Sequence, residues 1–136
     1  MSSERDAIPG IQIDFGIPSM DDSHHQLLAE LDEIAKANDQ EFANWYPQLI
    51  AAMEQDFRVE EDMMEACNLQ SWQAHMEQHA RMLAGLHAAV SPVESGDLVP
   101  GREAVGLLRQ WLPFHIATMD RELAEQTRAV QDKAST

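Results

Sequence analysis

The chain has 136 residues, the size of a single domain. Its 9 Lys and Arg against 24 Asp and Glu give a formal net charge of −15, and such a surface repels nucleic-acid phosphates and anionic membranes. Hydrophobic residues make up 44% of the chain, which argues against disorder along its whole length.

Further features of the sequence bear on location. No apolar run approaches the roughly 20 residues that a membrane-spanning helix needs, and the first residues lack the pattern of a secretory signal. A single cysteine, Cys67, excludes an internal disulfide and is expected to be a small buried side chain. We therefore expect a cytoplasmic protein without nucleic-acid or membrane partners.

The first 18 residues contain too much glycine and proline for a helix. We expect residues 1–18 to form an N-terminal arm that lies on the domain, anchored by Ile11, Ile13, Phe15 and Ile17. A first helix is predicted over 19–38, with Ser19 as its N-cap. On this helix His24 falls on the apolar stripe formed by Leu27, Leu28 and Leu31.

The next two predicted helices carry polar side chains on their apolar stripes. The second begins between 41 and 47, because Pro47 fits best in a first turn. Its stripe includes Asp56 and Glu60, which are four residues apart and therefore lie one above the other. The third helix opens at Ser71 and places two histidines at the same spacing, His75 and His79.

Residues 91–101 are predicted to form a loop, and a fourth helix follows with His115 on its stripe. Asp120 comes five residues after His115, and an ideal α-helix would rotate it about 140° away from that histidine. Residues 129–136 are expected to be a polar, frayed tail.

Four amphipathic segments with short connections predict an all-α, up-down-up-down four-helix bundle over 19–128. Each polar stripe residue alone has an ordinary structural explanation. Buried imidazoles and carboxylates are costly without partners, however, and one or more from each of four helices at one level is what a bundle needs to hold two metal ions. His25 and His87 are expected at the surface or beside the ligands.

These residues carry a family resemblance that covers roughly residues 11–125. In order along the chain, the sequence resembles bacterial hemerythrins and hemerythrin-like domains in four motifs, at residues 21–24, 56–61, 75–79 and 111–120. No single motif is specific, but the four in this order are. The resemblance implies a four-helix bundle with a non-haem di-iron centre, bridged by carboxylates and an oxo or hydroxo group, that binds O2.

Carried over residue by residue, the resemblance implies seven iron ligands. Three histidines would hold one iron, namely His75, His79 and His115. His24 and the residue at position 56 would hold the other iron, and Glu60 and Asp120 would bridge the two.

The sequence also departs from the family pattern. The family has a histidine at the position of Asp56 and a Tyr-Pro pair at the position of Leu69 and Gln70. In addition, Pro113 lies inside the fourth predicted helix of this chain. An additional anionic oxygen ligand favours ferric iron, so Asp56 is expected to promote autoxidation. Because the aspartate is shorter than histidine, it either reaches the iron or hydrogen-bonds a water in the histidine's place.

Three functions remain open at this point. The first is a carrier, store or sensor of O2 or a related small ligand. The second is a di-iron enzyme that reduces O2, peroxide or NO, and the third is a metal buffer or an interaction bundle. The six ligand residues that match the family argue against the third, and the resemblance favours the first. Sensing would need a signalling partner, and an enzyme would need an electron donor.

Overall fold

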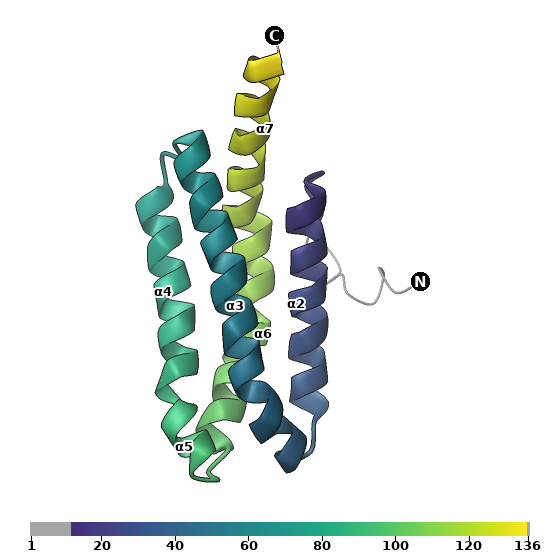
Figure 1. The fold of residues 1–136 in the computed structure, drawn as a ribbon, viewed down its shortest axis with the longest axis vertical. Coiled ribbons are helices and arrows are strands. Elements are labelled where there is room, and N and C mark those ends of the chain that lie inside the picture. Colours follow the sequence, from purple (N-terminus) through teal and green to yellow (C-terminus); the bar gives the residue numbers. More distant parts are fainter. Residues whose placement is uncertain (1–11, 136) are drawn as a thin grey trace.

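The computed structural model describes residues 12–135, and within that range every regular element is helical. The long helices run alternately up and down and pack side by side, so the predicted four-helix bundle is confirmed (Figure 1). Their bounds are α2 Pro18–Lys36, α3 Asp39–Cys67, α4 Trp72–Ala88, α6 Val99–His115 and α7 Arg121–Ser135, with a short α5 at Val90–Glu94 and a π-helical turn, η1, at Ile116–Asp120. The fourth leg of the bundle is therefore α6, η1 and α7 together.

Residues 12–17 lie as an extended segment against the bundle. Ile13 and Phe15 are buried, as expected for anchors of the arm, and Ile17 is half-buried. Ile11 and the rest of the arm lie outside the described residues. Hydrogen bonds from the backbone N–H groups of Phe15 and Gly16 to the Asp21 carboxylate, at 2.8 and 3.0 Å, attach this segment to α2.

Two helix starts differ from the sequence prediction. Ser19 is not the N-cap of α2, because the helix already begins at Pro18, whose fixed φ suits a first turn. Helix α3 begins at Asp39, since Asn38 and Glu41 cap it reciprocally: Asn38 Oδ1 accepts the Glu41 N–H at 2.8 Å, and Glu41 Oε1 accepts the Asn38 N–H at 3.2 Å. Pro47 therefore lies inside the helix.

The prediction of a loop over residues 91–101 is wrong in part. Helix α5 occupies Val90–Glu94, and α6 begins at Val99 with Pro100 in its first turn. The chain end also differs from the expectation, since α7 stays helical to Ser135 and extends past the other helices (Figure 1). Within residues 12–135, no helix is both long enough and apolar enough to cross a bilayer.

Candidate metal centre

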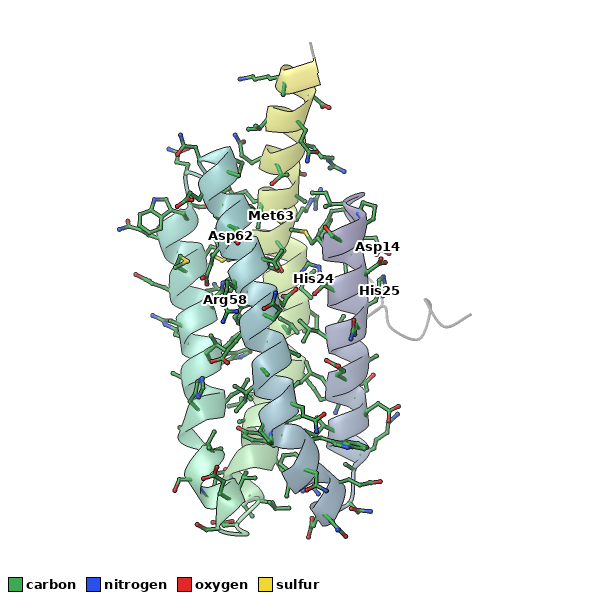
Figure 2. All side chains as sticks on the ribbon, in the orientation of Figure 1. Asp14, His24, His25, Arg58, Asp62 and Met63 are labelled. Carbon is green, nitrogen blue, oxygen red and sulfur yellow. The ribbon has the colours of Figure 1, made fainter. Side chains whose placement is uncertain are left out.

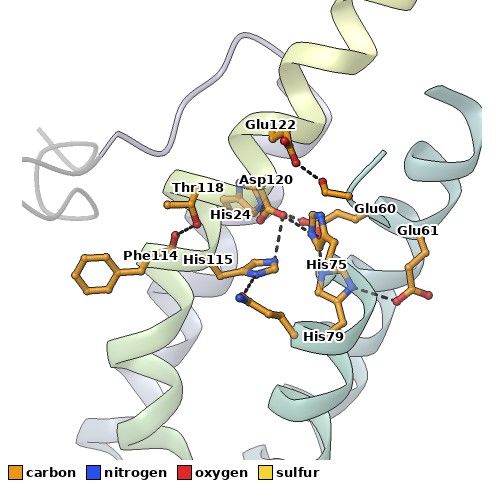
Figure 3. A network of polar contacts seen from close by, with 12 residues as sticks. His24, Glu60, Glu61, His75, His79, Phe114, His115, Thr118, Asp120 and Glu122 are labelled. Atoms are coloured by element: carbon orange, nitrogen blue, oxygen red, sulfur yellow. Dashed lines mark hydrogen bonds and ion pairs between the residues drawn. The ribbon is translucent and has the colours of Figure 1, made fainter. Parts of the chain in front are cut away.

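All seven predicted ligands lie together inside the bundle, and none is more than 8% exposed. His24 comes from α2, Glu60 comes from α3, and His75 and His79 come from α4 (Figure 3). The second carboxylate from α3 is Asp56. The fourth leg supplies the last two, His115 at the end of α6 and Asp120 at the end of η1. Four segments far apart in sequence thus deliver imidazoles and carboxylates to one buried region.

The donor atoms form two groups that share Glu60. Within each group the candidate donor atoms lie within 4.8 Å of one another. The larger group has five members, Glu60, His75, His79, His115 and Asp120, and the smaller has three, His24, Asp56 and Glu60. His75, His79 and His115 thus fall in one group and His24 and Asp56 in the other, while Glu60 belongs to both.

Glu60 and Asp120 each turn one oxygen toward each group. Glu60 Oε1 lies 2.9 Å from His79 Nε2, whereas its Oε2 lies 3.1 Å from His24 Nε2. Asp120 Oδ1 lies 2.9 Å from the Nε2 of His75, whereas its Oδ2 lies 3.0 Å from His24 Nε2. Both carboxylates therefore have the arrangement that a bridge between two ions requires.

The π-helical turn explains how Asp120 reaches the same face as His115. In η1 the Arg121 N–H bonds back to the Ile116 carbonyl, five residues earlier, so the chain rotates less per residue than in an α-helix. His115 Nε2 and Asp120 Oδ1 are consequently 3.2 Å apart. Pro113 supplies no N–H to the ladder, and Thr118 Oγ1 donates to the Phe114 carbonyl at 2.7 Å, which loosens the α-helical pattern at this point.

The donor set fits bound metal ions better than it fits a hydrogen-bond network. Among the residues described, the buried Nε2 atoms of His75, His79 and His115 make no hydrogen bond of acceptable geometry, although carboxylate oxygens lie about 3 Å away. Two donors about 2.1 Å from one ion and at right angles to each other are about 3 Å apart. Buried polar atoms without hydrogen-bond partners are costly, and a shared cation removes that cost.

Two histidines are oriented from behind by polar side chains. His79 Nδ1 lies 3.1 Å from Glu61 Oε2, and His115 Nδ1 lies 2.9 Å from Gln78 Oε1. These bonds fix the tautomer that leaves each Nε2 free to bind a metal. Phe57 also stacks on the His79 ring, with centroids 3.8 Å apart and planes 3° from parallel.

Asp56 is held by a neighbour of His24. The Ser23 hydroxyl donates a hydrogen bond to Asp56 Oδ1. The other carboxylate oxygen, Oδ2, is buried and has no hydrogen-bond partner among residues 12–135. Asp56 thus belongs to the group that contains His24 and Glu60, and one of its two oxygens has no partner among the described residues.

The two remaining histidines in the described range lie outside the centre. His25 points away from the cluster and its Nε2 pairs with Asp14 Oδ1 at 2.7 Å (Figure 2). His87 is 51% exposed and pairs with Glu54 at 3.0 Å. Of the two adjacent histidines on α2, His24 is the one that faces the carboxylates.

Burial and charge shift the acid–base behaviour of the centre strongly. Burial and the charge of Glu60 raise the pKa of Asp56 to about 7, against the opposing bond from Ser23. Burial would lower the pKa values of His24 and His75, but the adjacent carboxylates of Asp120 and Glu60 outweigh it and raise them to about 10 and about 9. Despite their burial, Glu60 and Asp120 have lowered pKa values because the imidazoles around them favour the charged carboxylates. Protons on the imidazoles compensate the negative charge of the buried carboxylates, and a bound metal ion can take the place of these protons.

The chain is similar to a known bacterial protein. It is 28% identical over 106 residues to a bacteriohemerythrin of Ralstonia nicotianae (strain ATCC BAA-1114 / GMI1000), covering 78% of this chain and 77% of that protein. The similarity supports a hemerythrin-like family. No family model matches the chain, and no solved structure does. The buried cluster itself is a group of His, Glu and Asp side chains that could hold metal ions.

Sequence reasoning did not identify the side chains that support the ligands. Ser23, Glu61 and Gln78 each contact a predicted ligand, yet each looks like an ordinary surface residue in the sequence. The sequence does carry one signal for them, because a histidine that binds metal through Nε2 needs a hydrogen-bond acceptor at Nδ1. Polar residues next to the ligand stripes are therefore candidates for that acceptor.

Proposed function

We propose that this protein holds two iron ions and binds O2 or a related small ligand at the iron nearer Asp56. The proposed ligands are the seven buried residues, with three histidines at one iron (His75, His79 and His115), with His24 and Asp56 at the other, and with Glu60 and Asp120 as bridges. Mixed imidazole and carboxylate donors inside a helix bundle are typical of non-haem di-iron sites.

One observation carries the proposal: both bridging candidates divide their oxygens between the two groups. A single ion in the larger group would use only one oxygen of each carboxylate, Glu60 Oε1 and Asp120 Oδ1. The other oxygens, Glu60 Oε2 and Asp120 Oδ2, lie 3.1 and 3.0 Å from His24 Nε2, where a second ion would bind. The similarity to a bacteriohemerythrin supports iron as the metal.

The donor count favours the smaller group as the place where an external ligand binds. The larger group offers five protein donors, while His24, Asp56, Glu60 and the far oxygen of Asp120 offer four around the other position. A position with fewer protein ligands keeps more room for a substrate molecule. Iron supplies reversible binding or reduction of O2 there, and the protein supplies the charge and the shape of the site.

The test is an absorption spectrum of the reduced, iron-loaded protein, exposed to air and then degassed. Bands that appear in air and disappear under vacuum support a carrier, store or sensor. Iron-loaded protein whose spectrum does not respond to O2 would contradict the proposal.

A second candidate is a di-iron enzyme that reduces O2, peroxide or NO, and Asp56 is the observation that favours it. A buried carboxylate in the smaller group adds negative charge, which favours ferric iron and makes bound O2 harder to release. Irreversible oxidation in air, together with multiple turnovers when an electron donor is supplied, would support the enzyme over the carrier.

A further inference from the structure

A groove of about 300 Å³ runs between α2 and α3 and ends at the smaller donor group. Asp56 and Glu60 form part of its wall, together with Ser23 beside His24. The ligands themselves are almost completely buried, so any ion that reaches them must pass through an opening of this kind.

The walls of the groove have the chemistry of a path for cations. Its titratable side chains are all acids, Glu30, Asp56 and Glu60, and no lysine, arginine or histidine among residues 12–135 lines it. Four further side chains supply neutral oxygens, Ser19, Ser23, Gln26 and Gln55. Oxygen donors of this kind suit hard divalent cations, whereas small anions are repelled.

Two carboxylates that line the groove each have one buried oxygen without a partner among the described residues. Asp56 is 8% exposed, and its Oδ2 makes no hydrogen bond there. The same holds for Oε1 of the half-buried Glu30, which stands on α2 two helical turns from Ser23. Unpaired buried carboxylate oxygens point to a cation as the missing partner, and here they stand at two positions along the groove.

We propose that this groove is the route by which Fe(II) enters the centre, with Glu30 as a transit ligand and Asp56 as the acceptor at its inner end. The inference rests on the proposed di-iron function and adds the path and a further metal-binding residue. It also gives Asp56 a role in loading, apart from its effect on the iron once bound.

The experiment measures anaerobic uptake of Co(II), whose visible bands report binding without any O2 chemistry, in metal-free protein by stopped flow. Ala52 is half-buried and lines the groove, whereas the adjacent Ala51 is exposed and does not. Ala52→Lys should slow uptake about tenfold and leave the final stoichiometry unchanged, because a cation in the path raises the electrostatic barrier. Ala51→Lys carries the same charge change and should stay within about twofold of wild type.

A second pair of variants removes charge instead of adding it. Glu30→Gln should slow uptake several-fold, and Asp22→Asn, at an exposed position of α2 outside the groove, should not. Equal rates for Ala52→Lys and Ala51→Lys, together with a normal rate for Glu30→Gln, would overturn the entry route while the di-iron site stands. Wild-type protein that takes up no metal would overturn both proposals.

Discussion

At position 56 a buried carboxylate stands among ligand-type residues where the family resemblance places an imidazole. Its Oδ1 is held by Ser23 and its Oδ2 has no partner among residues 12–135, so in the proposed centre the side chain would bring a negative charge to the iron nearer His24. A carboxylate stabilises ferric over ferrous iron relative to a neutral nitrogen donor. We therefore expect the redox behaviour of the proposed centre to depend on this residue.

Replacing Asp56 by histidine tests that dependence. Reduced wild-type protein should autoxidise quickly in air, and Asp56→His should slow autoxidation about tenfold, because a neutral donor removes the added charge. The rate is followed by the absorption spectrum, with iron content measured on the same sample. Equal rates at equal iron content would mean that residue 56 does not control the chemistry.

The histidines divide into two classes with different expected effects. His79→Ala or His115→Ala should abolish the iron spectrum, because each removes a buried donor from the larger group. His25→Ala and His87→Ala serve as matched controls and should keep it, since their partners are Asp14 and Glu54 at the periphery. Loss of iron in the His25 variant with retention in a His24 variant would reverse the assignment on α2.

The spacing of residues along the chain predicted which side chains lie on the ligand stripes, but not how they are supported. Histidines and carboxylates at four-residue spacing among apolar residues are readable from the helical period alone. Glu61 and Gln78 act across helices, on His79 and His115, and such contacts depend on packing that no local pattern encodes.

At the scale of elements, the π-helical turn is the main feature that the sequence did not predict. With α-helical rotation, Asp120 would point away from His115, and only the i→i+5 hydrogen bonds of η1 bring the two together. The sequence prediction also places the starts of α2 and α3 too late. Pro18 and the Asn38–Glu41 cap mark these helix starts more strongly than Ser19 and Pro47 do.

The junction of α5 and α6 gives a test of element packing. A Cβ on Gly101 would lie 2.7 Å from Val93 Cγ2 and 3.0 Å from a ring carbon of Phe42, so Gly101→Ala should destabilise the fold by about 1–3 kcal/mol. Gly106→Ala on the same helix meets no atom within 4 Å among the residues described, and should stabilise it by about 0.5–1 kcal/mol. Urea unfolding of the two variants measures this difference, and effects of the same sign would contradict the packing.

For the molecule as a whole, the shifted pKa values predict how stability depends on pH without metal. His24 and His75 have pKa values of about 10 and about 9, above their ordinary 6.5, so their stabilisation is complete below pH 6.5 and lost as pH rises toward 10. Asp56 acts in the same direction between about pH 4 and 7, because its pKa is raised. Glu60 and Asp120 have lowered pKa values and lose their contribution in acid. Metal-free protein should therefore be most stable at mildly acidic pH.

Bound iron should remove most of this dependence, because metal ions replace the protons on the ligands. Urea unfolding at pH 6.5, 8 and 9.5 should show falling stability for metal-free protein and a much flatter profile for iron-loaded protein, which should also be more stable throughout. The same pH slope with and without iron would be inconsistent with ligation by these histidines.

The central claim is that the two donor groups hold two irons through shared carboxylates. It is tested most directly by anaerobic titration of metal-free protein with Fe(II), with bound iron counted per chain and His24→Ala titrated alongside. The account predicts a plateau at two irons for wild type and at one for His24→Ala, because that variant keeps the larger group and loses the only imidazole of the smaller one. A plateau at one iron in wild type, or the same count in both proteins, would contradict it.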